Sequence, residues 1–118
     1  MAALVCAVDV GTTSARAAIL DSNGRLLGRA EHPIAIRRAG PDIAEHDSED
    51  IWRAVCHAVR GARAAADARP EEIAGIAFDA TCSLIIRGRE REPLPLSSSE
   101  GQDWDTIAWL DHRAQAEA

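Results

Sequence analysis

The sequence has few cysteines, an excess of acidic over basic side chains, and no long hydrophobic run. The three cysteines, Cys6, Cys56 and Cys82, are widely spaced and form no C-x-x-C pair. An odd number at these spacings argues against a disulfide framework and against a zinc site. The four histidines share no spacing typical of metal ligands either. Because thiols stay reduced inside cells, we expect a cytoplasmic location.

The shortage of positive charge argues against a nucleic-acid partner, and the shortness of the apolar runs argues against a signal peptide or a membrane span. The net charge of the 118 residues is −6, whereas a nucleic-acid partner requires a basic surface. The first apolar run is too short for the core of a signal peptide and is interrupted by Asp9. No segment approaches the ~18 apolar residues that a membrane span needs. The length fits one domain that buries roughly two-thirds of its unfolded surface.

The most informative segment runs from Asp9 to Arg16, between apolar residues 3–8 and 17–20. The two apolar runs predict strands, with the polar residues at the tip of a β-hairpin. Gly11 allows close approach of the backbone to a ligand, and successive N–H groups of such a turn can bind an anion. An ordinary hairpin turn remains an alternative, since Asp, Gly, Thr and Ser all favour turns.

The acid in this turn indicates magnesium. Asp9 alone repels a phosphate, whereas a hydrated Mg²⁺ between the two satisfies both, because Mg²⁺ keeps several waters and takes one or two carboxylates. Arg16 supplies positive charge and a rigid fork of donors. The segment differs from a Walker A loop, which needs G-x-x-x-x-G-K-[ST]. We predict that a phosphate and a water-bridged Mg²⁺ at Asp9 are held by Asp9, Gly11, Thr12, Thr13, Ser14 and Arg16.

Periodicity and turn residues predict an α/β fold. Residues 25–36 follow the turn at Ser22-Asn23-Gly24 and complete a three-stranded antiparallel meander. Asp47 or Ser48 caps a helix that ends at Arg69-Pro70. The apolar run 73–78 predicts a buried strand, which the intervening helix makes parallel to the first strand.

The last third of the sequence gives weaker patterns. Residues 84–87 and 94–96 predict a hairpin around Gly88, and the polar stretch 97–103 predicts a mobile loop. Residues 106–110 predict a short strand, and 111–118 predict the start of a helix. The resulting order is βββαβ, with a phosphate turn between the first two strands.

Two further clusters add to the opening motif. Asp79 and Thr81 follow the parallel strand, where α/β sheets present ligand-binding groups, and the sequence W-L-D-H-R begins at Trp109. The opening D-x-G-T-x-S-x-R resembles the first phosphate loop of the sugar kinase, heat-shock chaperone and actin superfamily, with its ribonuclease H-like fold. With W-x-D-x-R added, the chain resembles the FGGY family of carbohydrate kinases. The F-D-A-T-C-S segment is most similar to the D-ribulokinase branch.

The resemblance implies ATP-dependent phosphorylation of a sugar hydroxyl, with a pentulose such as D-ribulose as substrate and ATP and Mg²⁺ as cofactors. It places the sugar in an N-terminal domain and ATP in a C-terminal domain. The substrate-binding residues that it implies are Asp79, Thr81, Asp111 and Arg113. Two structural alternatives stay open: Asp111 can cap the final helix, and Trp109 can be core packing.

The chain departs from the family in length, since members are several times longer. The general-base aspartate of the family lies in a later motif, so the resemblance supplies no catalytic residue here. Residues 1–118 therefore correspond to the N-terminal portion of the sugar-binding domain, and we expect this chain alone to be inactive and to self-associate as a homodimer. The alternative function is a non-enzymatic nucleotide-binding or assembly module of the actin and chaperone type.

Overall fold

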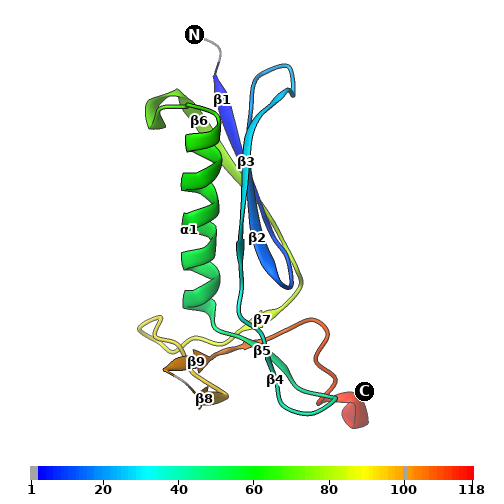
Figure 1. Ribbon diagram of the computed structural model, residues 1–118. Helices are drawn as coiled ribbons and strands as arrows, with labels where there is room; N and C mark the ends of the chain where they lie inside the picture. Colours follow the sequence, from blue (N-terminus) through cyan, green and yellow to red (C-terminus); the bar gives the residue numbers. More distant parts are fainter. Residues whose placement is uncertain (1–2, 100) are drawn as a thin grey trace.

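A computed structural model of the chain describes residues 3–99 and 101–118. Its main sheet has four strands in the order β3-β2-β1-β6 (Figure 1). These strands are β1 (Leu4–Val10), β2 (Ser14–Leu20), β3 (Leu26–Pro33) and β6 (Ile73–Ala80). β1 pairs antiparallel with β2 and parallel with β6. The predicted meander, the parallel strand after the helix and the βββαβ order are confirmed.

Helix α1 (Ser48–Ala65) connects the meander to β6. Of the two predicted caps, Asp47 is the one observed, because its carboxylate accepts hydrogen bonds from the backbone N–H groups of Glu49 and Asp50. The helix ends before the predicted Arg69, since Asp67 has a φ of 49° and cannot continue it. Within residues 3–99 and 101–118, no helix is long and apolar enough to cross a membrane.

The core lies between α1 and one face of β1, β2 and β3, and most of it is built from small side chains. Its members are Cys6, Val8, Ala15, Ala17, Ile19, Ile34, Ala54, Val55, Ala58, Ala62 and Ala68. Helix and sheet come very close at Gly28 on β3, where an added Cβ would lie 2.5 Å from the backbone nitrogen of Ala66. Glycine at this position therefore sets the distance between the helix and the sheet.

The three cysteines are all free thiols. Cys6 is buried in the core, and burial raises the pKa of its thiol. Cys6 thus packs as a small buried hydrophobe, whereas Cys56 is half-buried and Cys82 is exposed.

A second layer of short strands crosses the lower end of the main sheet (Figure 1). One sheet has the order β4-β5-β10-β7, and a two-stranded sheet pairs β8 with β9. These strands are β4 (Arg37–Arg38), β5 (Ala44–His46), β7 (Leu84–Ile85), β8 (Ser97–Ser99), β9 (Gln102–Trp104) and β10 (Thr106–Ile107). The predicted hairpin around Gly88 is confirmed, because Gly88 N donates to Glu92 O at 2.9 Å.

Two predictions for the last third were wrong, and a third was correct only in part. The stretch 97–103, expected to be a mobile loop, pairs as β8 and β9, although Glu100 lies outside the described residues. The strand expected over 106–110 is only the two residues of β10. The expected helix over 111–118 is a single 3₁₀ turn, Gln115–Glu117, because the Asp111 carboxylate bonds to β5 and to Arg113.

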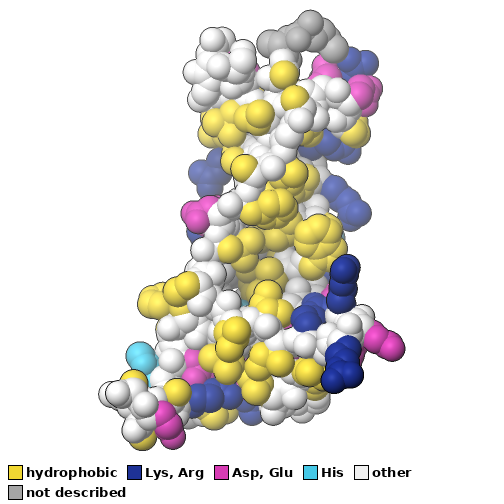
Figure 2. All heavy atoms as spheres, turned by 180° about the vertical axis from the view of Figure 1, so that it is seen from behind, with side chains coloured by type: hydrophobic (Ala, Val, Ile, Leu, Met, Phe, Trp, Pro, Cys, Tyr) yellow, Lys and Arg dark blue, Asp and Glu magenta, His cyan; other side chains and the backbone are white. Residues whose placement is uncertain are grey.

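Residues 73–78 form the predicted strand, but the expectation that this strand is buried was wrong. β6 is an edge strand with β1 as its hydrogen-bonded neighbour, and α1 lies mainly over β2 and β3. Ile76 and Phe78 consequently remain 51% and 56% exposed. They line a hollow of about 200 Å³ beside Trp52 and Val59 of α1. Figure 2 shows apolar side chains gathered in a band along the back of the molecule.

This exposed edge predicts that the chain self-associates, because unpaired strand edges and contiguous apolar patches are templates for pairing between chains. We expect size-exclusion chromatography with light scattering to show a mass that rises from monomer towards dimer with concentration. Phe78→Glu should shift the species towards monomer. Leu26→Glu, at an equally exposed position on β3, is the matched control and should leave the mass unchanged. A wild-type monomer at every concentration would contradict the prediction.

Candidate functional site

The turn between β1 and β2 consists of Gly11, Thr12 and Thr13, and hydrogen bonds fix it on both sides. Gly11 N donates to Ser14 O, and Ile34 N donates to Thr13 O, both at 2.9 Å. A Cβ at residue 11 would lie 2.8 Å from Nη2 of Arg16, so glycine leaves room for that guanidinium. Asp9, Ser14 and Arg16 lie in the flanking strands and not at the tip.

Three charged side chains lie side by side across three strands. Asp9 on β1 is in register with Arg16 on β2 and with Asp79 on β6. Their neighbours Val8 and Ala17 belong to the core under α1, so alternation along the strands puts the charged row on the opposite face. Arg16 donates from Nε (3.2 Å) and Nη2 (2.7 Å) to Oδ2 of Asp9. This hydrogen bond to Asp9 is the main cause of the raised pKa of Arg16.

The carboxylates fit a hydrated divalent cation. Both bonds from Arg16 go to the same oxygen, Oδ2 of Asp9. Among the described residues, no donor is bonded to Oδ1 of Asp9 or to the Asp79 carboxylate. Two neighbouring carboxylates, of which only Asp9 is paired with an arginine, leave an excess of negative charge. Mg²⁺ that retains most of its waters suits such a pair.

A cleft of about 450 Å³ opens where the turn meets the end of β6. Its lining residues are Asp9, Val10, Gly11, Thr12, Thr13, Arg16, Asp79, Ala80, Thr81 and Trp109. The structure therefore brings together seven of the ten predicted site residues. Ser14 is buried beneath the turn, where its hydroxyl accepts a hydrogen bond from Nη1 of Arg16 at 3.2 Å. Asp111 and Arg113 do not line the cleft.

One wall of the cleft is a short polar chain. Thr81 N donates to Val10 O at 3.2 Å, which extends the β1–β6 pairing into the loop. The hydroxyls of Thr81 and Ser83 lie 3.1 Å apart, and Ser83 Oγ accepts a hydrogen bond from Trp109 N at 3.1 Å. Trp109 Nε1 donates to Thr12 Oγ1 at 2.9 Å. At 56% exposed, Trp109 is not core packing. Trp109 was not among the predicted site residues, although its place in the W-x-D-x-R cluster was a signal that could have found it.

Asp111 and Arg113 form an ion pair beside the cleft. Arg113 donates to the Asp111 carboxylate, with Nη2 at 2.6 Å from Oδ2, and also to Oε2 of Glu45 at 2.9 Å. Asp111 Oδ2 also accepts from Ala44 N at 2.8 Å, which fastens the chain to β5. Asp111 is therefore not the cap of an α-helix. Its role as a substrate ligand stays a prediction.

The hydrogen bonds from Arg113 hold the pKa of Asp111 below its ordinary value, and the partners Asp111 and Glu45 raise the pKa of Arg113. Because the folded-state pKa of Asp111 is lowered, the stability that it contributes is present above the ordinary carboxyl pKa. It is lost only as the pH falls below that value. The pair stays ionised at neutral pH.

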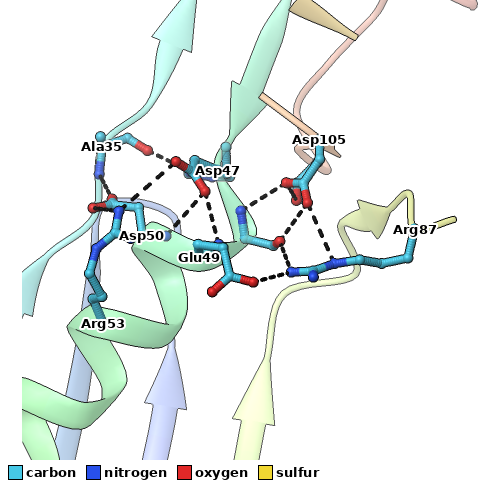
Figure 3. Close-up of polar contacts among 10 residues, drawn as sticks. Ala35, Asp47, Glu49, Asp50, Arg53, Arg87 and Asp105 are labelled. Atoms are coloured by element: carbon cyan, nitrogen blue, oxygen red, sulfur yellow. Dashed lines mark hydrogen bonds and ion pairs between the residues drawn. The ribbon is translucent and has the colours of Figure 1, made fainter. Parts of the chain in front are cut away.

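A second polar cluster joins the N-terminus of α1 to the segment after β6 (Figure 3). Asp105 is fully buried, and its carboxylate accepts from Ser48 N at 2.8 Å and from Ser48 Oγ at 2.5 Å. Arg87 reaches this carboxylate with Nε at 3.6 Å and donates to Glu49 at 2.8 Å. Sequence reasoning missed this cluster, because its members come from three separate segments.

Known proteins resemble this chain over nearly its whole length. Residues 4–117 match the N-terminal domain of the FGGY family of carbohydrate kinases. The chain belongs to this family. The FGGY chain is 39% identical to a D-ribulokinase from Saccharomyces cerevisiae over 112 residues. These residues are 93% of this chain and 16% of the relative.

Solved structures show the same fold. A gluconate kinase from Lactobacillus acidophilus superposes with a TM-score of 0.80 at 23% identity, over 99% of this chain and 22% of that one. A glycerol kinase from Plasmodium falciparum with ADP has a TM-score of 0.67 at 17% identity, over 98% and 22%. This FGGY chain thus spans about a fifth of the length of its relatives. The predicted ribonuclease H-like α/β fold and family are confirmed.

Proposed function

We propose that residues 1–118 form the N-terminal portion of the sugar-binding domain of an ATP-dependent kinase that phosphorylates a pentulose such as D-ribulose. The observation that carries this proposal is the cleft in which the phosphate turn meets Asp79 and Thr81. Phosphoryl transfer requires the acceptor hydroxyl and the phosphate to be held in one place. The similarity to a D-ribulokinase over 93% of the chain supports a pentulose as the acceptor.

Each part of the cleft has a distinct task in this proposal. The backbone N–H groups of Thr12 and Thr13 and the guanidinium of Arg16 receive phosphate oxygens. Gly11, whose N–H is already bonded to Ser14 O, leaves room for the guanidinium, and Ser14 fixes it from below. Asp9 and Asp79 have different surroundings, since Arg16 binds only Asp9, and we assign them different ligands. Asp9 holds the water shell of Mg²⁺, which neutralises phosphate charge when bound. Asp79 and Thr81 accept hydrogen bonds from sugar hydroxyls.

A thermal-shift experiment on this chain tests sugar binding directly. A ligand that binds only the folded state raises the unfolding midpoint. We expect D-ribulose to raise it and Asp79→Ala to abolish the shift, while Asp103→Ala, which removes an exposed carboxylate outside the cleft, preserves it. In a coupled assay of ADP release we expect no sugar phosphorylation by the chain alone. No shift with any pentulose would contradict the sugar site.

In a complete kinase that carries this segment, substitutions of Asp9 and Asp79 should affect different kinetic constants. We expect Asp9→Asn to lower kcat by about a hundredfold or more with little change in the sugar KM, because it removes charge stabilisation at the phosphates. Asp79→Ala should instead raise the sugar KM. Steady-state kinetics with varied sugar and saturating ATP measures both effects. A change confined to the sugar KM in Asp9→Asn would overturn the metal assignment.

A further inference from the structure

The bond between Trp109 and Thr12 joins residues that are 97 positions apart in the sequence. The turn backbone is held at Gly11 and Thr13 by other groups, whereas the Thr12 hydroxyl is held by the indole. An indole N–H is only a donor, so Thr12 Oγ1 must act as the acceptor. The hydroxyl therefore keeps its own proton to donate to a further oxygen.

The position of the indole is itself fixed from two sides. Trp109 N donates to Ser83 Oγ, which ties the residue to the loop after β6. Two residues later, the buried Asp111 carboxylate binds Ala44 N and Arg113. Arg113 in turn binds Glu45, whose carboxylate is 2% exposed and also accepts from Arg37 at 2.8 Å. These ion pairs anchor the segment that carries the tryptophan.

We propose that Trp109 is a positioning residue for the phosphate turn: its indole N–H holds Thr12 so that the hydroxyl donates into the cleft, towards a phosphate oxygen. Asp111 and Arg113 serve this arrangement as its anchor. The inference rests on the proposed function, which assigns the turn as a phosphate-binding site. A hydroxyl that accepts one hydrogen bond becomes a better donor in the next, because hydrogen bonds in a chain polarise one another.

The first experiment observes the bond itself, with no ligand present. In ¹⁵N-labelled chain, the indole N–H signal of Trp109 is assigned by its loss in Trp109→Phe. We expect Thr12→Val to shift this signal and to speed its exchange with solvent by about tenfold, and Thr12→Ser to restore both. The indole of Trp104, which donates to Ser99 at 2.8 Å, should be unchanged and reports that the fold is intact. An unshifted Trp109 signal in Thr12→Val would overturn the proposal.

The second experiment uses inorganic pyrophosphate with Mg²⁺ as the probe and measures affinity by titration. Trp109→Phe and Thr12→Val should each weaken binding by about fivefold, the effect of one typical hydrogen bond. The double variant should bind no more weakly than Thr12→Val, because Trp109 acts through Thr12. Trp52→Phe, an equally exposed tryptophan on α1, should bind as wild type.

Additive losses in the double variant would overturn the positioning role. Wild-type chain that binds no pyrophosphate would count against the proposed phosphate site. In that case the indole shift and exchange decide the positioning role alone, with the same two outcomes. Failure of the proposed function and failure of this inference are therefore distinguishable.

Discussion

Gly28→Val should lower the free energy of unfolding of this chain by about 3 kcal/mol, the upper end of the cost of overpacking. A Cβ at this position would lie 2.5 Å from Ala66 N and 2.6 Å from Ala62 O. Both atoms belong to the backbone at the end of α1, so no side-chain rotation relieves the clash. The helix must move away from β3, which opens the core. Urea unfolding followed by circular dichroism measures the loss.

Gly75→Val is the matched control for this substitution. Gly75 lies on β6 of the same sheet, and a Cβ there would meet no atom within 4 Å. Its φ is not positive, and valine favours strands, so we expect its stability to equal or exceed that of wild type. Equal losses at both positions would mean that the cost reflects strand glycines in general and not the contact with α1.

Asp105→Ala should lower the free energy of unfolding by about 3–5 kcal/mol, the usual effect of removing one member of a buried ion pair. The carboxylate has no exposed surface and receives Ser48 N, Ser48 Oγ and Thr106 Oγ1. Alanine would leave these donors buried without acceptors. It would also remove one of the partners of Arg87, which joins the hairpin after β6 to α1 (Figure 3).

Asp103→Ala provides the comparison, since that carboxylate lies two residues away, is exposed and accepts one bond from Ser98. We expect a change within about 0.5 kcal/mol, as for most surface substitutions. Both variants can be compared by urea unfolding at neutral pH. A loss at Asp105 no larger than at Asp103 would show that the Ser48 contacts contribute little to the stability of the folded chain.

The main sheet and α1 were predictable because their signals are local. Strands of seven or eight residues show apolar patterns, Asn23-Gly24 marks a turn, and Asp47 is a favourable cap. The strands of the second layer have two or three residues, too few to show any period. Their pairing joins Thr106 to both His46 and Ile85, which no local pattern reports. The exposure of β6 was unpredictable from an apolar run that is typical of buried strands.

In the candidate site, too, local features could be predicted and contacts between distant segments could not. The turn residues and Asp79 carry their chemistry in short motifs, so sequence reasoning could propose them, and the fold brings them to one cleft. The hydrogen bond from Trp109 to Thr12 and the ion pair of Arg113 with Glu45 depend on the tertiary fold. Glu45 in particular had no motif around it, although its buried carboxylate orients the W-x-D-x-R segment.

The small side chains between α1 and the sheet also determine which mutations the chain can accept. Ala15, Ala17, Ala54, Ala58 and Ala62 are each at most 4% exposed, and Gly28 sits among them. Truncating an alanine removes one methyl group, so little void can form, whereas any enlargement meets closely spaced backbone. Selection on this interface therefore acts against added volume and only weakly against lost volume, the reverse of a core built from leucine and phenylalanine.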